Sequence, residues 1–465
     1  MDRRYVVVGS GPAALKACES IRTVDATGQI TVIGREPEAY YSRPGLAYYL
    51  ADEVGEDGLF PLDGQALARI GAGFVLGIAK EVRPAQHQVV LEGGQAIGYD
   101  RLLLATGSTA IIPAVEGVGL DGVVKLDDME DAHGIIARSR QAKAAVVVGG
   151  GITALEIVEG LLARKVRVHY LMRKDRYWGN VLAEVESRLV EDRLRRCGVI
   201  VHYFTELGRI LGRQGRVAGV ETTKGEVIPC QMVGLAIGVT PRKGLAEAAG
   251  LECGRGVIVD EHLRSSDPDI FAAGDLAETR DAATGRYTME VLWSSAVEKG
   301  QVAGLNMAAM PAAEPARGVA AAPAGGPGLV VPDGALPGHV YRKAVALNVT
   351  RLAGYPATIM GRVGSGEDDD LKGIARGDSE TWRRKGEATT TVLSDSGDTH
   401  LRLVLEDDTI GGAVVMGDQE ASFPLQGLIA LRVPLGATRD RLLQPRADLA
   451  PLLEQAWQGH RSRHV

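Results

Sequence analysis

Apolar residues change their spacing repeatedly along the first 310 positions, and the changes predict strands alternating with helices. Short runs rich in valine, isoleucine and leucine lie at residues 4–8, 29–34 and 99–108, as expected for buried parallel strands. Apolar residues at helical spacing follow the first run over residues 12–22. This order predicts an α/β unit built on a parallel sheet.

The same order recurs from about residue 115, which predicts a second α/β unit. It comprises a strand at 145–148, a helix from Thr153, a strand at 166–171 and a buried strand with a glycine turn in 231–241. Strand, Gly-Asp turn and helix are then expected within 269–278, and a helix rich in small residues within 289–308.

The pattern changes after residue 310. Residues 311–338 are rich in proline, alanine and glycine without a periodic apolar face, which predicts a linker or surface loop. Beyond this segment we expect a smaller α+β unit, with a hairpin at 400–418 and a short helix at 449–458.

Two glycine-rich turns carry the candidate chemistry. The segments VVVGSGPAAL (6–15) and VVVGGGITAL (146–155) each follow a short β-branched run and precede a helix. In such a fingerprint the first glycine makes the sharp bend, the second lets the backbone approach a pyrophosphate, and a later small residue lets helix and strand pack closely. Two fingerprints predict two dinucleotides, and therefore a flavoprotein that also binds a nicotinamide nucleotide.

Composition narrows the range of functions. The 465 residues allow roughly three domains. The formal charge of -7 argues against nucleic acid as a partner. We expect no membrane span, because no apolar stretch approaches about 18 residues. The early first strand leaves no room for a signal peptide, so a cytoplasmic protein is expected.

The four cysteines form no motif of their own. Cys18, Cys197, Cys230 and Cys253 make no C-x-x-C or C-x4-C pair, so we predict no redox disulfide and no metal site. Isolated thiols in the core or on helices are the simpler interpretation. Any iron-sulfur centre must then belong to a partner.

Taken in order over residues 4–310, the two fingerprints, LLLATGS, LAIGVTP and FAAGD resemble the pyridine-nucleotide and FAD-dependent oxidoreductases with two dinucleotide-binding domains. The resemblance implies two Rossmann-like domains, the NAD(P) domain inserted between two FAD segments, and a C-terminal α+β interface domain. The implied division is an FAD domain at 1–114 and 242–310, an NAD(P) domain at 115–241, a linker at 311–338 and a C-terminal domain at 339–465.

The loop YSRPGLAYYL (41–50) distinguishes branches of that family. Its Arg43-Pro44 pair resembles the element that packs beside the isoalloxazine in ferredoxin and rubredoxin reductases, nitrite reductase flavoprotein domains and apoptosis-inducing factor. Pro44 stands where related NADH oxidases, peroxidases and coenzyme A disulfide reductases carry a catalytic cysteine. Chemistry that needs a thiolate nucleophile is therefore disfavoured.

Further roles follow from the resemblance. Glu156 matches the glutamate that approaches the nicotinamide, although it could be a surface acid, and Tyr48 stands where relatives place its lysine partner. Asp275 would hold the FAD ribityl and pyrophosphate region, or simply cap a helix. Glu36 would bind the adenine ribose, or be a solvated loop charge.

Three more positions are implied for the ends of the two cofactors. Met172 occupies the place of the acid that binds the NAD ribose, and Arg173 follows it, which favours NADP while leaving NAD open. Glu290 and Trp293 would lie at the flavin edge on the helix after the Gly-Asp turn, and Trp293 could equally be a core residue.

The implied catalytic residues are Glu156, Arg43, Pro44 and Tyr48. The implied cofactor-binding residues are Gly9, Gly11, Pro12, Ala13, Ala14, Glu36, Arg43, Ala105, Thr106, Gly107, Gly149, Gly151, Ile152, Thr153, Glu156, Arg173, Gly238, Gly274, Asp275, Glu290 and Trp293.

The predicted function is hydride transfer between NAD(P)H and FAD, followed by electron exchange with a separate redox protein or subunit, iron-sulfur by expectation. The chain could serve as the NAD(P)-reactive flavin subunit of a larger complex, and a homo-oligomer or hetero-complex is open. Two alternatives are an NAD(P)H oxidase that uses oxygen directly and a flavin-binding scaffold subunit.

Overall fold

The computed structural model describes residues 2–37, 40–61, 65–281, 285–310, 338–364, 374–383, 389–396, 399–445 and 447–464. The chain forms two compact units. Unit 1 comprises Met1–Ser42, Phe60–Thr109 and Thr240–Lys343; unit 2 comprises Arg43–Leu59, Ala110–Val239 and Ala344–Val465. No helix among the described residues is both long and apolar enough to cross a membrane.

Unit 1 is built on a five-stranded parallel sheet in the order β19-β7-β1-β2-β3. Its strands are β1 (Arg4–Val8), β2 (Gln29–Gly34), β3 (Ala72–Leu76), β7 (Arg101–Leu104) and β19 (Ile270–Ala272). The predicted runs at 4–8 and 29–34 are confirmed, and β7 confirms the strand expected within 99–108. Most residues of β1, β2, β7 and β19 are buried, which explains their apolar sequences, whereas Leu76 at the end of the edge strand β3 is exposed.

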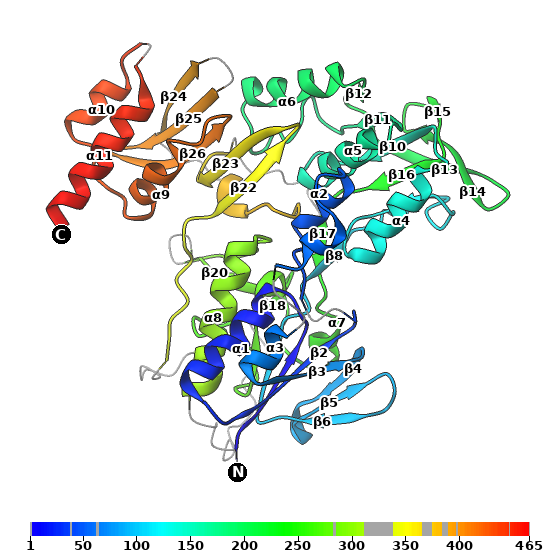
Figure 1. Ribbon diagram of the computed structural model, residues 1–465, viewed down its shortest axis with the longest axis vertical. Coiled ribbons are helices and arrows are strands. Elements are labelled where there is room, and N and C mark those ends of the chain that lie inside the picture. Colours follow the sequence, from blue (N-terminus) through cyan, green and yellow to red (C-terminus); the bar gives the residue numbers. More distant parts are fainter. Residues whose placement is uncertain are drawn as a thin grey trace, which may run out of the picture. The chain divides into compact units, whose positions relative to one another are not determined.

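Helices α1 (Pro12–Val24) and α8 (Trp293–Ala309) pack side by side in unit 1 (Figure 1). A Cβ on Gly300 would lie 2.3 Å from the carbonyl oxygen of Ala13, and one on Gly304 would lie 2.4 Å from that of Ala17. The two glycines therefore allow the helix backbones to contact each other. This contact explains the small residues of the 289–308 segment.

The segment after the Gly-Asp turn corrects one prediction. A helix was expected there, but Gly274–Leu276 form a single 3-10 turn (η3), and Ala277–Arg280 form strand β20. Strand β20 pairs with β18 (Val257–Ile258) and β21 (Tyr287–Thr288). These pairings outweigh the local propensity of the sequence Ala-Glu-Thr-Arg.

The remaining elements of unit 1 are short. They are α3 (Ala66–Ile70), α7 (Gly244–Ala248), η2 (Pro84–Gln86) and the antiparallel strands β4 (Ala79–Arg83), β5 (Gln88–Leu91) and β6 (Ala96–Gly98). Strands β8 (Ser108–Ala110) and β17 (Val239–Pro241) form a two-stranded sheet.

Unit 2 contains a second five-stranded parallel sheet, in the order β12-β11-β10-β16-β9. Its strands are β9 (Val123–Val124), β10 (Ala144–Val148), β11 (Arg167–Leu171), β12 (Ile200–His202) and β16 (Met232–Leu235). Its helices and flanking hairpin are α2 (Gly45–Leu50), η1 (Glu56–Leu59), α4 (Met129–Ser139), α5 (Ile152–Ala163), α6 (Glu184–Arg196), β13 (Leu207–Arg213), β14 (Arg216–Thr222) and β15 (Val227–Pro229). The predicted repeat of the α/β pattern is confirmed.

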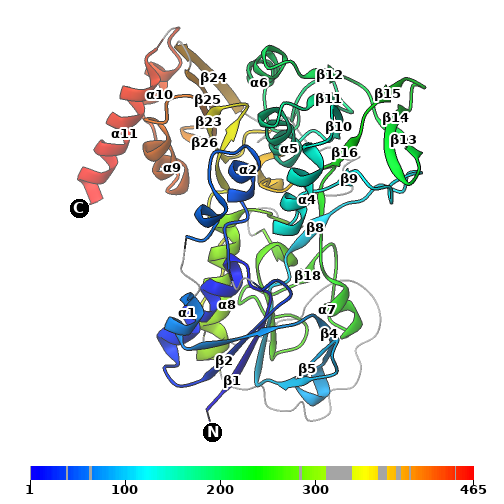
Figure 2. The same cartoon turned by 45° about the vertical axis from the view of Figure 1, so that its right-hand side comes forward.

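The C-terminal part of unit 2 is an antiparallel sheet with helices on one face (Figure 2). Its elements are β22 (Leu347–Leu352), β23 (Tyr355–Gly361), η4 (Glu380–Arg383), β24 (Thr389–Ser396), β25 (Thr399–Glu406), β26 (Thr409–Met416), α9 (Ser422–Ala430), α10 (Ala437–Leu442) and α11 (Leu449–His464). The predicted hairpin is β25–β26. The predicted helix at 449–458 is confirmed and continues through Gly459 to His464. The predicted linker lies outside the described residues apart from Gly338.

A buried ion cluster in unit 2 joins the C-terminal sheet to α6. Glu186 is fully buried and accepts hydrogen bonds from Arg402 Nε at 2.7 Å and from His400 Nε2 at 3.1 Å. The other ring nitrogen of His400 lies 2.6 Å from Asp395. Burial alone would lower the pKa of His400, but the two carboxylates outweigh it and raise the pKa.

This arrangement predicts a stability that falls as pH rises. The folded pKa of His400 lies above its unfolded value of about 6.5, so the stabilisation is complete below that pH and is lost as pH rises through the folded pKa. Urea unfolding between about pH 6 and about pH 9 should show this slope, and His400→Gln should reduce it. His133→Gln, which removes an exposed partner of Glu56, serves as the control and should leave the slope unchanged.

Candidate functional site

The first fingerprint forms a tight turn at the carboxyl end of β1. Gly9 has φ +120°, and a Cβ there would lie 2.2 Å from the carbonyl oxygen of Ala105. Gly11 begins α1 with extended backbone, and a Cβ placed on it would meet nothing within 4 Å. The turn is therefore closed where it touches the neighbouring strand end and open over the helix N-terminus, which matches the space a pyrophosphate needs.

Other predicted residues of unit 1 gather around that turn. Gly274, with φ +71°, lies against the side chain of Ala13, since a Cβ on Gly274 would be 3.3 Å from it. Asp275 accepts a hydrogen bond from Ser108 Oγ at 2.8 Å. It is not the cap of a regular helix, because it lies within a single 3-10 turn that strand β20 follows. The carboxyl ends of β1, β7 and β19 thus meet where ligands bind in parallel sheets.

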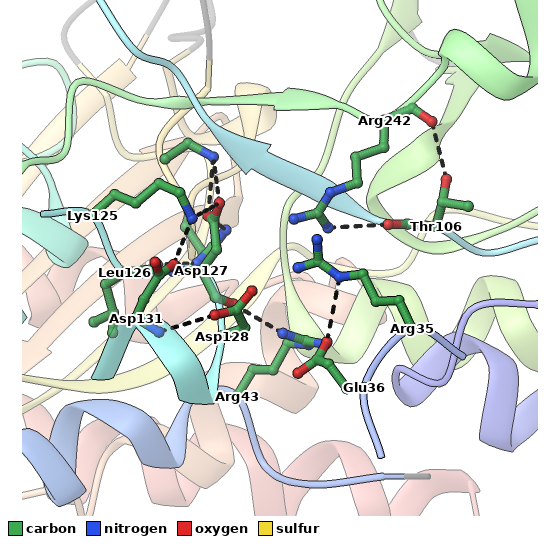
Figure 3. Close-up of polar contacts among 12 residues, drawn as sticks. Arg35, Glu36, Arg43, Thr106, Lys125, Leu126, Asp127, Asp128, Asp131 and Arg242 are labelled. Carbon is green, nitrogen blue, oxygen red and sulfur yellow. Dashed lines mark hydrogen bonds and ion pairs between the residues drawn. The ribbon is translucent and has the colours of Figure 1, made fainter. Parts of the chain in front are cut away.

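Contacts of Thr106 and of Glu36 hold the adjoining loops of unit 1 (Figure 3). Thr106 donates from Oγ1 to the carbonyl oxygen of Arg242 at 3.1 Å, and Arg242 Nη1 donates to that of Thr106 at 3.2 Å. Glu36 accepts a hydrogen bond from Tyr41 at 2.7 Å and lies 3.8 Å from Arg35. Glu36 is therefore fixed within its loop, and its ribose role stays a prediction.

Glu290 lies outside the helix on which it was predicted, whereas Trp293 is the first residue of that helix. Glu290 precedes α8, which begins at Trp293, because Leu292 has an extended backbone. Glu290 is buried, accepts a hydrogen bond from Ser295 Oγ at 2.9 Å and lies 3.4 Å from Lys343 Nζ. The side chain of Trp293 is 52% exposed. The alternative that Trp293 is a core residue is therefore wrong.

The second fingerprint repeats the geometry of the first in unit 2. Gly149 has φ +145°, and a Cβ there would lie 2.1 Å from the carbonyl oxygen of Ala236. Gly151 begins α5. A small pocket lies beside it. The pocket is lined by Ala110, Leu126, Asp127, Gly151, Thr153, Leu235, Ala236, Gly238, Val239, Ala375 and Arg376.

Two side chains of α5 give this region its chemistry. The buried Oγ1 of Thr153, which lines the pocket, has no hydrogen-bond partner among the described residues. Glu156 lies one turn further along, and burial raises its pKa to about 7 against the opposing charge of Arg376. An open hydroxyl at a helix N-terminus and an acid that titrates near neutrality fit a bound dinucleotide.

The loop after β11 follows the sequence prediction in part. Met172, in the place of the ribose-binding acid, is buried, whereas Arg173 is exposed. Arg176 is paired with Asp175 at 2.9 Å. The role of Arg173 at the 2′-phosphate of NADP stays a prediction.

Asp127 was missed by the sequence analysis and organises this part of unit 2 (Figure 3). Its fully buried carboxylate accepts hydrogen bonds from Lys125 at 3.0 Å, from Arg376 at 2.6 Å and from the backbone N–H of Ala110 at 3.0 Å. Its carbonyl oxygen accepts a hydrogen bond from Arg43 Nη1 at 2.9 Å. One aspartate thus orients the predicted flavin-side arginine and two other cations.

Two other predicted residues of the 41–50 loop belong to the region of α2, which packs on α5. Pro44 precedes α2, and α2 packs on α5 where a Cβ on Gly160 would lie 2.8 Å from Leu50 Cβ. The ring of Tyr48 lies under the guanidinium of Arg351, 5.2 Å from it. The expected lysine is thus replaced by an aromatic ring that a different cation covers.

The four cysteines, all of them in the described part of the chain, form no disulfide. All four cysteines are free, and burial raises the pKa of Cys18 and of Cys230 to about 12. Among the described residues, no group of histidines, cysteines and acids could hold a metal ion.

Comparisons with known proteins agree with this geometry. The family model of pyridine nucleotide-disulphide oxidoreductases matches residues 3–300. A probable ferredoxin reductase of Castellaniella defragrans is 33% identical over 285 residues, 59% of this chain and 68% of its own length. A rubredoxin-NAD(+) reductase of Pseudomonas putida is 31% identical over 301 residues, 64% of this chain and 78% of its own.

The same fold is found among solved structures. The chain superposes on a putidaredoxin reductase, crystallised as a covalent complex with putidaredoxin, with a TM-score of 0.79 and 21% identity. The match covers 98% of this chain and 99% of that one. The predicted α/β architecture with two dinucleotide-binding folds is confirmed.

We expect substitutions of the two glycines in the first turn to affect different properties, FAD binding for Gly11 and stability for Gly9. Gly11→Ala should change the free energy of unfolding by no more than about 0.5 kcal/mol, because its backbone suits alanine and the space is open. It should nevertheless lower FAD occupancy, since the methyl group fills the phosphate position. Gly9→Ala should cost about 2–5 kcal/mol through strain and the clash with Ala105. Thermal unfolding and bound-flavin absorbance measure both; full flavin occupancy in Gly11→Ala would contradict the assignment.

Proposed function

The chain belongs to the pyridine nucleotide-disulphide oxidoreductase family, and on that basis we propose that it is an FAD-dependent NAD(P)H oxidoreductase. It moves hydride between the nicotinamide and FAD, and electrons between FAD and a separate redox protein. The observation that carries the proposal is the presence of two fingerprints, each at the carboxyl end of its own parallel sheet. Two such turns in one chain are built for two dinucleotides.

Each turn has residues suited to its dinucleotide. In unit 1 the open face of Gly11 and the turn at Gly274 and Asp275 would hold the FAD phosphates and ribityl chain. In unit 2 Thr153 and the N-terminus of α5 would bind the phosphates of NAD(P)H. When bound, FAD supplies the hydride acceptor and the conversion between two-electron and one-electron transfer.

Glu156 would assist the nicotinamide end of the nucleotide. Loss of hydride leaves a positive charge on the nicotinamide ring, and an ionised carboxylate nearby stabilises that charge. The backbone carbonyl of Asp127 would keep Arg43 at the flavin side of the loop. No general acid is needed, because no proton has to be transferred with the hydride.

The proposed electron partner is an iron-sulfur protein. The similar proteins are named as ferredoxin and rubredoxin reductases, and the four cysteines of this chain are free, so no disulfide is present to receive electrons. Free thiols are typical of a reducing compartment, so we place the protein in the cytoplasm.

Anaerobic titration of the FAD-loaded full chain tests the function. One equivalent of NADH or NADPH should bleach the flavin absorbance, and the reduced protein should then reduce an added ferredoxin or rubredoxin. The order of preference between the two nucleotides decides the role of Arg173. Absence of bleaching with both would exclude the proposal, whereas rapid oxygen uptake without any partner would favour an oxidase.

The role of Glu156 predicts a pH dependence. Because its pKa is raised to about 7, anaerobic flavin reduction by the nucleotide should speed up as pH rises through that value. Glu156→Gln should slow reduction at high pH on the order of 100-fold and remove the dependence. Glu159→Gln is the matched control, since Glu159 lies on the same helix and its pKa is also raised by burial to about 7. A pH profile unchanged in Glu156→Gln would show that another group titrates.

A further inference from the structure

A short segment of the C-terminal part of unit 2 lies on the second fingerprint. We call residues 374–378 the strap. At its start the backbone N–H of Val239 donates to the carbonyl oxygen of Ile374 at 2.9 Å, and the two residues form an antiparallel bridge. Val239 follows the glycine turn at Gly238, so the strap begins at the edge of the nucleotide pocket.

The strap fills the space that the fingerprint leaves open. A Cβ on Gly151 would lie 3.0 Å from the Cβ of Ala375, and one on Gly377 would lie 3.2 Å from Cδ1 of Ile152. The equivalent Gly11 of the first fingerprint has no described atom within 4 Å at the same place. The two turns have the same backbone design, yet among the described residues only the second is covered.

A glycine is expected at position 151 because a side chain there would obstruct the approach of a pyrophosphate. A methyl group in contact with that glycine occupies the volume through which the phosphates would pass. The pocket that remains is bordered by Ala375 and Arg376 themselves, and the hydroxyl of Thr153, which lines it, has no hydrogen-bond partner among the described residues. Strap and nucleotide therefore compete for one position.

Arg376 is the strongest anchor of the strap. Its guanidinium donates to Asp127 Oδ1 at 2.6 Å and to the carbonyl oxygen of Leu126 at 2.5 Å. Asn348 holds the other end through the carbonyl oxygen of Gly377 at 2.8 Å. If Arg376 leaves, the buried carboxylate of Asp127 keeps Lys125 and the N–H of Ala110 as partners. The anchor can therefore be released without leaving Asp127 unpaired.

We propose that Arg376 sets the affinity of this chain for its nicotinamide nucleotide, by fastening the strap over Gly151 so that the pyrophosphate binds only after the strap has moved. Arg376 acts through the strap and is a positioning residue. The inference rests on the proposed use of the second fingerprint for NAD(P)H. Because only the fraction of molecules with a displaced strap can bind, weakening the anchor raises the apparent affinity.

Calorimetric titration with ADP-ribose, which carries the pyrophosphate without the nicotinamide, tests the proposal on the FAD-loaded full chain. Arg376→Gln should lower the Kd for ADP-ribose by about tenfold. It should lower the KM for the nucleotide similarly. A merely structural role would not raise affinity.

Two further variants make the result specific. Ala375→Gly removes the methyl group against Gly151 and should also tighten ADP-ribose binding, which keeps the test open if Arg376→Gln does not fold. Arg351→Gln is the matched control, since Arg351 pairs with Glu53 and Glu159 and does not line the pocket. The Kd of Arg351→Gln for ADP-ribose should equal that of the wild type.

The strap itself gives a direct readout. Addition of ADP-ribose should speed amide hydrogen exchange at Asp378, whose N–H donates to the carbonyl oxygen of Ala375 at 3.1 Å. Equal or weaker binding of ADP-ribose by Arg376→Gln would overturn the proposal. Weaker binding would indicate that Arg376 is a phosphate ligand instead. If the wild type neither binds ADP-ribose nor is reduced by NADH or NADPH, the proposed function fails, and the strap proposal fails with it.

Discussion

The whole arrangement depends on two places where a backbone carbonyl oxygen occupies the position of a missing Cβ. The carbonyl oxygen of Ala105 lies 2.2 Å from that position on Gly9, and that of Ala236 lies 2.1 Å from it on Gly149. Any larger residue would force the central strand of each sheet away from its neighbour. The contact brings two strand ends together, and the space between the ends and the following helix is what a dinucleotide can occupy.

Asp127 has a comparable role within unit 2, through charge instead of shape. A fully buried carboxylate is tolerated only when cations and N–H groups surround it. Lys125, Arg376 and Ala110 do so here, while the carbonyl oxygen of the same residue holds Arg43. Segments distant in sequence are thereby fixed around the nucleotide pocket, so a change at this one residue would disturb several predicted functions together.

The sequence predicted the two parallel sheets because their strands are continuous apolar runs that end in glycine turns. It failed where tertiary pairing overrides local preference, as at Ala277–Arg280, where pairing on both sides makes a strand of residues predicted as a helix. It also gave no sign of α9, whose nine residues include Pro424 and Gly427. The Asp127–Arg376 pair could not be predicted, since the partners lie 249 positions apart and neither belongs to a motif. The cofactor roles of single residues stay predictions.

The close packing of α1 on α8 has a consequence for biosynthesis. Unit 1 needs β19 to complete its sheet and α8 to cover α1. Residues 4–24 can therefore complete their packing only after Ile270–Ala272 and Trp293–Ala309 have been synthesised. The parallel sheet of unit 2 lies within residues 123–235 and is complete much earlier. In a growing chain the second parallel sheet therefore has all its strands before the first sheet does. The sheet whose first strand is made later is the one whose strands are complete first.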